Sequence, residues 1–142
     1  SAIDNDVAMS EAGIMAAVAD YEARYIAYRA ETIAQTESVR AANFGLHAAY
    51  TQAIDRGALP DEAVRRYWQT AMDEGVCPIC DAIPDNNADG VRVSEKFNVI
   101  NHEPIYNPPQ HVRCRCSINY VTDLDKVPDD KPGLAAVVEV AA

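Results

Sequence analysis

Five side chains that commonly bind metal ions lie in two clusters of the sequence, and they include every cysteine of the chain. The first cluster is the pair Cys77 and Cys80, and the second, about thirty residues later, contains His111, Cys114 and Cys116. A tight Cys-x-x-Cys pair brings two thiolates to one point, and a returning cluster supplies the other ligands of a tetrahedral zinc ion. The spacing therefore predicts a structural zinc site.

The second cluster offers three candidates for two ligand positions. On an extended chain the side chains of Cys114 and Cys116 would lie roughly 6.6 Å apart, whereas two sulfurs bonded to one zinc ion lie only about 3.8 Å apart. Two solutions remain open: the first cysteine pair with His111 and one later cysteine, or all four cysteines with a kink at Arg115. All five residues are candidate ligands, and we favour the set that contains the histidine.

Three other kinds of cysteine site fit the sequence less well. Thiol-redox chemistry requires the first cysteine at the N-terminus of a helix, whereas residues 81–90 are rich in turn-forming types and predict an exposed loop. An iron–sulfur centre would use the same four thiolates. A catalytic zinc needs an open position and a nearby base, and no motif places the candidates His102 and Glu103 near the metal.

The composition predicts a soluble, globular and non-secreted chain of about one domain. Of the 142 residues, 49% are hydrophobic and 24% are charged, which is normal for a folded domain. No apolar run is long enough to span a membrane, and the N-terminus lacks the pattern of a signal peptide. The first residue is serine rather than methionine, which we expect of a fragment or a processed product.

The charge balance disfavours non-specific binding to duplex DNA. The net charge is −10, from 12 basic and 22 acidic residues, whereas such binding comes from neutralising phosphates with Lys and Arg. Arg113 and Arg115 form the most basic edge, and they are the candidates for a DNA contact. Such arginines are more often solvated, or paired with Asp73, Glu74 or Asp81.

Two helical segments are expected in the first part of the chain. Apolar residues recur every three or four positions over 6–34 and again over 36–56, which is the pattern of amphipathic helices. Gly57 follows at the position of a left-handed C-terminal cap. The tyrosines of the first segment either line the core of the domain, which is the commoner case, or pack on a partner.

The rest of the chain is expected to form short strands and turns. Residues 66–71 predict a strand that leads into the first cysteine pair, with Trp68 packed over the metal site, and 114–122 predict a final strand. Further short strands are expected around Val91 and Phe97, and the apolar tail 134–140 is expected to dock. The predicted fold class is α+β, with long N-terminal helices followed by a small zinc-stapled β-hairpin or sheet region.

Several motifs together give the chain a resemblance to a known family. They appear in a fixed order and at characteristic spacing: 31–37, 42–45, Tyr50, Gly57, Trp68, Thr70, 73–80, Phe97 and the Pro-Pro-x-His-x-x-Cys-Arg-Cys of 108–116. With these residues, the stretch from about Arg29 to Val121 resembles the phage head morphogenesis proteins of the Mu F type. The expected organisation is a helical extension over 1–28, a Mu F-like minor head domain with the zinc knuckle over 29–122, and a proline-rich tail over 123–142.

The resemblance implies a minor capsid protein of a tailed phage or phage-like particle, with zinc as a structural cofactor and no enzymatic activity. The implied place is the capsid interior near the portal vertex of the virion, after assembly in the host cytoplasm. The implied roles are head assembly and DNA packaging or ejection. The implied partners are the portal protein, the major capsid protein and packaged DNA, without a membrane or a small-molecule substrate. The alternative is a zinc-scaffolded nuclease or effector domain, for which the sequence lacks an evident catalytic His, Asp and Asn constellation.

Overall fold

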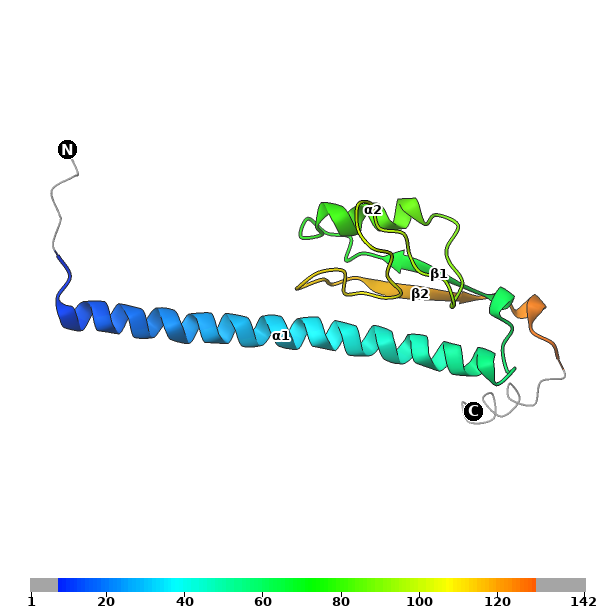
Figure 1. Cartoon of the computed structure of the whole chain (residues 1–142), viewed down its shortest axis with the longest axis horizontal. Coiled ribbons are helices and arrows are strands. Elements are labelled where there is room, and N and C mark those ends of the chain that lie inside the picture. Colours follow the sequence, from blue (N-terminus) through cyan, green and yellow to red (C-terminus); the bar gives the residue numbers. More distant parts are fainter. Residues whose placement is uncertain (1–7, 130–142) are drawn as a thin grey trace.

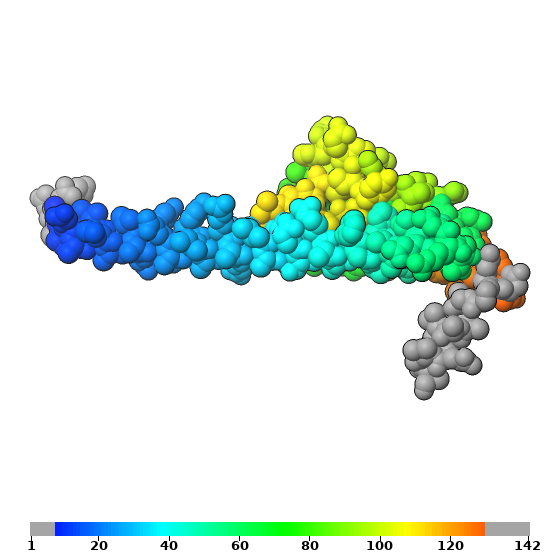
Figure 2. All heavy atoms as spheres, turned by 60° about the horizontal axis from the view of Figure 1, so that its bottom comes forward, coloured from blue at the N-terminus to red at the C-terminus, as the bar shows by residue number. Residues whose placement is uncertain are grey.

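A computed structural model describes residues 8–129, which form one long helix and a smaller body packed on part of it. Helix α1 spans Glu11–Asp55, and residues 56–129 are the body. The body covers only the C-terminal half of α1, so the N-terminal half projects beyond it (Figure 1 and Figure 2). The expected docking segment 134–140 lies outside the described residues.

Helix α1 continues through the point where two separate helices were expected to meet. The side chain of Ser10 caps its N-terminus by accepting a hydrogen bond from the amide of Gly13. Gly57, with a φ of 73°, follows its C-terminus as predicted. The expected break around Gln35 contains neither proline nor glycine, and the hydroxyl of Thr36 is satisfied within the helix. The prediction of two helices is therefore wrong, because nothing in the sequence interrupts the first.

The body is built on a two-stranded antiparallel sheet. Strand β1 spans Val64–Gln69, and strand β2 spans Ser117–Thr122. Their register places Val64 opposite Thr122 and Gln69 opposite Ser117. Short 3-10 helices flank the sheet at Asp61–Ala63 and Leu124–Lys126. The long helix and the small sheet confirm the α+β class.

Most of the chain between the two strands has no regular structure. The stretches expected to be short strands make only isolated bridges, Arg66 with Val91 and Phe97 with Ile105. The prediction of strands is wrong there, because each stretch pairs at a single position. Val91, Val93, Phe97 and Val99 are nevertheless buried, so the apolar pattern identified core residues without identifying their backbone.

Helix α2 spans Pro78–Asn86, where an exposed loop was expected. Cys77 is its N-cap, and the Cys77 sulfur accepts a hydrogen bond from the amide of Cys80. Pro78 occupies the first helical position, where its fixed φ favours the helix and its missing N–H is not needed. The loop prediction is wrong because the turn-forming residues lie at the C-terminal end of α2 and beyond it, where Asn87 closes the helix.

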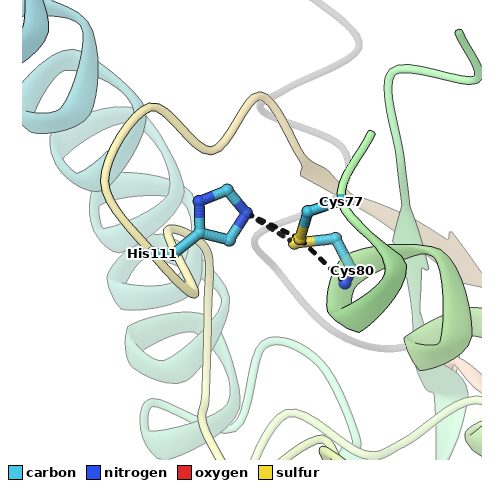
Figure 3. A group of neighbouring side chains, drawn as sticks. All are labelled: Cys77, Cys80 and His111. Carbon is cyan, nitrogen blue, oxygen red and sulfur yellow. Dashed lines mark hydrogen bonds between the residues drawn. The ribbon is translucent and has the colours of Figure 1, made fainter. Parts of the chain in front are cut away.

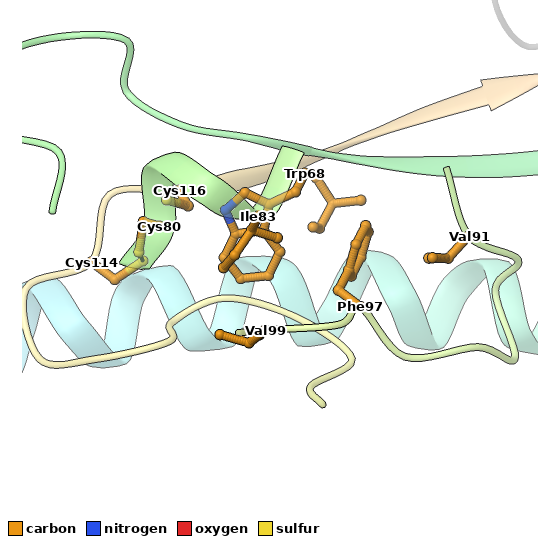
Figure 4. Close-up of a cluster of buried hydrophobic side chains, with 9 residues drawn as sticks. Trp68, Cys80, Ile83, Val91, Phe97, Val99, Cys114 and Cys116 are labelled. Atoms are coloured by element: carbon orange, nitrogen blue, oxygen red, sulfur yellow. Dashed lines mark hydrogen bonds between the residues drawn. The ribbon is translucent and has the colours of Figure 1, made fainter. Parts of the chain in front are cut away.

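The core of the body lies between the sheet, α2 and the irregular segments (Figure 4). Trp68 is 4% exposed, and Phe97 and Ile83 are fully buried. The rings of Trp68 and Phe97 meet edge to face, with their centres 5.4 Å apart, a favoured aromatic geometry. Three cysteines belong to the same cluster, namely Cys80, Cys114 and Cys116. Trp68 therefore packs among the candidate ligands, as predicted.

Arg66 is an inward-facing residue of β1 that is fully buried and ties the irregular chain to the sheet. Its guanidinium donates to four oxygens of residues 92–107. These are the carbonyls of Arg92, Glu95 and Tyr106 and the side-chain oxygen of Asn107. The same group lies 5.0 Å from the centre of the Phe97 ring. Burial lowers the pKa of Arg66, and the four oxygens take the place of water around its charge.

The body holds α1 largely through polar and aromatic contacts. The buried residues of α1 are Thr36 and Asn43. The Nε2 atom of His47 lies 2.8 Å from the carbonyl oxygen of Val93, which makes it the protonated ring nitrogen. Further along the helix, Tyr50 stacks on Tyr120, with the ring centres 4.2 Å apart.

The tyrosines of the first part of α1 do not line the core. Tyr21 is 68% exposed and Tyr25 is 53% exposed, and both lie in the projecting half of the helix. The expectation that these side chains are core residues is wrong, because the body does not reach Tyr21 or Tyr25 and meets Tyr28 only at its rim, through Arg113. Packing on a partner remains a hypothesis.

Replacing Arg66 with methionine should lower the free energy of unfolding by about 3 kcal/mol or more, because four buried oxygens lose their donor. Arg65→Met is the matched control, since Arg65 is the exposed neighbour on the same strand, and its effect should stay within about 0.5 kcal/mol. Urea unfolding followed by circular dichroism measures both. Equal effects at the two positions would contradict the role given to Arg66.

The contribution of His47 to stability should depend on pH. Burial lowers the pKa of His47 below its ordinary 6.5, an effect that the Val93 carbonyl offsets only in part. The ring is therefore neutral in the fold, and the stability it provides is complete above about pH 6.5 and is lost as the pH falls through the lowered pKa. The difference in unfolding free energy between the wild type and His47→Gln should shrink from pH 7 to pH 5. A constant difference would exclude this linkage.

Candidate metal centre

Two structural elements bring the candidate ligands together. Cys77 caps the N-terminus of α2, and Cys80 lies in its first turn. His111, Cys114 and Cys116 come from the irregular segment that leads into β2. The helix cap holds the first pair close together, while the strand fixes where the second cluster returns. The sequence predicted this meeting of the two clusters.

His111 faces the first cysteine pair (Figure 3). Its Nε2 atom lies 3.1 Å from the sulfur of Cys77 and 3.1 Å from the sulfur of Cys80. Its other ring nitrogen, Nδ1, lies 2.7 Å from the carbonyl oxygen of Val112, to which it can donate a proton. A backbone carbonyl commonly orients a metal-binding histidine in this way, and it leaves the Nε2 lone pair free for the ion.

Cys80 also belongs to a second group, with Cys114 and Cys116. The three sulfurs lie within 4.8 Å of one another, and those of Cys80 and Cys114 are 4.0 Å apart, close to the roughly 3.8 Å of two zinc-bound sulfurs. The expected kink is present one residue before Cys114, at Arg113 with a φ of 63°, rather than at Arg115. The turn brings both later cysteines towards Cys80, which a straight strand would not do.

A cavity of about 20 Å³ lies beside the cluster, which is enough for one water-sized sphere. Among the residues that line it are Cys77, Cys80, His111 and Cys116. Cys114 is not among them. One histidine and three cysteines thus meet this space, together with neighbours such as Ala71 and Arg115. Three cysteines and a histidine are a ligand set typical of structural zinc.

The protonation states of the thiols also fit a cation. Burial raises the pKa of Cys80 to about 12, and the neighbouring Cys114 together with burial raises the pKa of Cys116. The hydrogen bond with Cys116 lowers the pKa of Cys114 to about 5. A divalent ion would supply the positive charge that lets the buried thiols ionise as ligands.

The indole of Trp68 supports Cys116 as a ligand. Its Nε1 atom is buried and has no hydrogen-bond partner among the described residues. The indole lies beside Cys116, where it opposes the rise in the pKa of that thiol. A metal-bound thiolate at Cys116 would give this N–H an acceptor. The residues present therefore fit a structural metal ion held by Cys77, Cys80 and His111, with Cys114 or Cys116 as the fourth ligand. The lining of the cavity and the position of Trp68 favour Cys116.

The two arginines of the second cluster are held by internal partners. Arg115 binds both carboxylate oxygens of Asp73, each at 2.7 Å, which was the pairing expected of it. Arg113 donates to the hydroxyl of Thr32 and lies over the ring of Tyr28, 4.9 Å from its centre. The ligand segment is thereby anchored to the loop before α2 on one side and to α1 on the other.

Sequence reasoning missed the contacts of this segment with α1. The amide of Arg113 donates to the hydroxyl of Thr36 at 3.0 Å, and the Gln35 side chain reaches the carbonyl of Arg113. Thr36 belongs to the motifs quoted above, but its spacing alone gave no sign of a partner 77 residues away. His102 and Glu103 are exposed, and neither belongs to the candidate metal groups found among residues 8–129.

The presence of α2 removes the objection raised above to thiol-redox chemistry, because Cys77 does lie at a helix N-terminus. The surroundings of the pair nevertheless differ from those of two cysteines alone. His111 contacts both sulfurs, and Cys80 also meets two further thiols. A set of five converging ligand atoms favours metal binding over a two-cysteine redox pair.

The sequence model of the family described as Phage Mu protein F like protein matches residues 9–119. The chain belongs to this family. The resemblance drawn from the motifs is confirmed, and the match extends over residues 9–28, which those motifs did not include. Neither the curated proteins nor the solved structures compared with the chain gave a match. Within residues 8–129, no helix has the length and apolar character needed to cross a membrane.

Replacing Cys116 with serine should reduce the bound zinc to less than about half an equivalent, because Cys116 lines the cavity together with Cys77, Cys80 and His111. Cys114→Ser is the matched control and should retain most of the metal. Metal analysis after native purification measures both variants and the wild type. A loss confined to Cys114→Ser would assign the fourth position to Cys114, and a wild type without zinc would contradict the site.

Proposed function

We propose that this chain is a minor structural protein of a tailed-phage head, associated with the portal inside the head, where it assists head assembly and DNA packaging or ejection. Membership of the Phage Mu protein F like family, over nearly all of the described residues, is the observation that carries the proposal. The location at the portal vertex, the role in packaging and the identity of the partners are inferred from this membership.

The candidate metal centre supports a structural rather than a catalytic role. Five candidate protein ligands lie together there, and a set of four protein ligands is typical of structural zinc. The ion would fasten α2 to the segment before β2, and that segment in turn contacts α1 through Arg113. The site would then fix the position of the long helix on the body.

Contact with packaged DNA is proposed only at the edge formed by Arg113 and Arg115. The Arg115 side chain is 44% exposed although it is paired with Asp73, so it can meet a phosphate only by sharing or leaving that carboxylate. The net charge of −10 opposes broader contact. Protein partners in the head, the portal protein or the major capsid protein, therefore provide most of the proposed binding.

Cryo-electron microscopy of intact particles tests the proposal directly. We expect density for this chain inside the head at the portal vertex, and co-purification of the chain with the portal protein from lysates of infected cells. Arg115→Ala should weaken retention of DNA in a filter-binding assay while leaving the portal association unchanged. Absence of the chain from particles would overturn the proposal, and magnesium- or manganese-dependent cleavage of DNA would favour a nuclease instead.

A further inference from the structure

The projecting half of α1 carries a row of apolar side chains that the body does not cover. The row, here called the overhang stripe, consists of Ile14, Val18, Tyr21, Tyr25 and Tyr28. Each of these side chains is between 50% and 68% exposed. Figure 2 shows this part of the helix extending away from the body. An exposed apolar surface of this length is typical of a binding site.

The overhang stripe continues the face of α1 that packs on the body. Its residues are spaced by four, three, four and three positions, and each residue of an α-helix turns by about 100°, so they lie in one line along the axis. The next positions on this face are Thr32 and Thr36, each four residues further along, and both contact the segment around Arg113. Tyr28 already touches Arg113 at the rim of the body. The packed and the unpacked parts therefore form one continuous surface.

The apolar character of this face does not end where the body ends. The part covered by the body presents buried polar residues, Thr36 and Asn43, and half-buried apolar or aromatic ones, Val39, Tyr50 and Ile54. The part left open presents aliphatic and aromatic side chains, which gain most from leaving water. This distribution indicates that the overhang stripe is covered in the assembled state.

The charges beside the overhang stripe indicate what covers it. On residues 11–31 the charged side chains are Glu11, Asp20, Glu22 and Glu31 against Arg24 and Arg29. Arg24 pairs with Asp20 on the same helix. By helix geometry Glu11, Glu22 and Arg29 flank one side of the stripe, where acidic residues outnumber the basic one. A second copy of this chain, with its own net charge of −10, would bring like charges together, whereas a partner with basic flanks would be attracted.

We propose that the overhang stripe binds an amphipathic helix of another head protein, whose apolar face is flanked by lysines or arginines. The apolar row of Ile14 to Tyr28 would pack against the apolar face of that helix, and Glu11 and Glu22 would pair with its basic residues. The mode is that of two helices packing side by side through rows spaced by three and four residues. This inference rests on the proposed function, because it takes the partner from the phage head.

The test uses the full chain and two probes, the purified portal protein and the purified major capsid protein of the same phage. Tyr21→Ser combined with Tyr25→Ser should weaken binding to one of them at least tenfold in biolayer interferometry. Phe44→Ser is the matched control, since Phe44 and Tyr21 are both 68% exposed and Phe44 lies about 120° away around the helix. It should leave the affinity within about twofold of the wild type.

The charges are tested separately. Glu11→Lys combined with Glu22→Lys should weaken binding to the same probe, and the difference from the wild type should shrink as salt is raised, because screening removes the attraction. Retained zinc content and an unchanged circular dichroism spectrum would show that the body and α1 remain folded in each variant. An unchanged affinity in the charge variant would overturn the basic character given to the partner.

The possible failures can be told apart. If the wild type binds a probe and the double tyrosine variant binds it equally well, the inference fails while the proposed function stands. If the wild type binds neither probe, the proposed function fails together with the head partner. Analytical ultracentrifugation of the chain alone should give a monomer, and a dimer that the double tyrosine variant abolishes would assign the surface to a second copy and overturn the inference.

Discussion

The buried guanidinium of Arg66 is the interaction on which the body depends. Between β1 and β2 lie nearly fifty residues with one short helix and no other regular element, so their carbonyl groups lack partners in a ladder. Arg66 collects oxygens from both ends of the stretch 92–107 and binds them to the sheet. Its positive charge in turn is stable in the interior only because those oxygens converge on it. The oxygens therefore need the guanidinium as their donor, and the guanidinium needs the oxygens in place of water.

The cysteine cluster plays the corresponding part at the opposite end of the body. There the chain between α2 and β2 is held by soft ligands instead of carbonyl oxygens, and a divalent ion would replace the guanidinium as the central charge. Both centres attach irregular chain to a strand or helix, and each does so through polar or ligand contacts that require few apolar residues. A body with one small sheet buries a limited core, which explains why it relies on two charged centres.

The sequence revealed the side chains of the site better than the backbone that positions them. The pairing of the two cysteine clusters, the cap at Gly57 and the burial of Trp68 follow from local spacing and residue type. Helix α2 was missed because its proline and cysteine signals lie at its start, whereas turn-forming residues dominate its end. The roles of Arg66 and Thr36 depend on partners 26 or more residues away along the chain, which no periodic pattern encodes.

Because α1 is unbroken, it fixes both the distance and the angle between the surface that meets the body and the overhang stripe. The surface that meets the body and the overhang stripe lie on the same side because every residue between them keeps the helical phase. One inserted or deleted residue between Tyr28 and Thr32 would rotate one surface against the other by about 100°, whereas adding seven residues would nearly restore the alignment. The number of residues between Tyr28 and Thr32 therefore sets the direction in which the body faces relative to a partner bound at the overhang stripe.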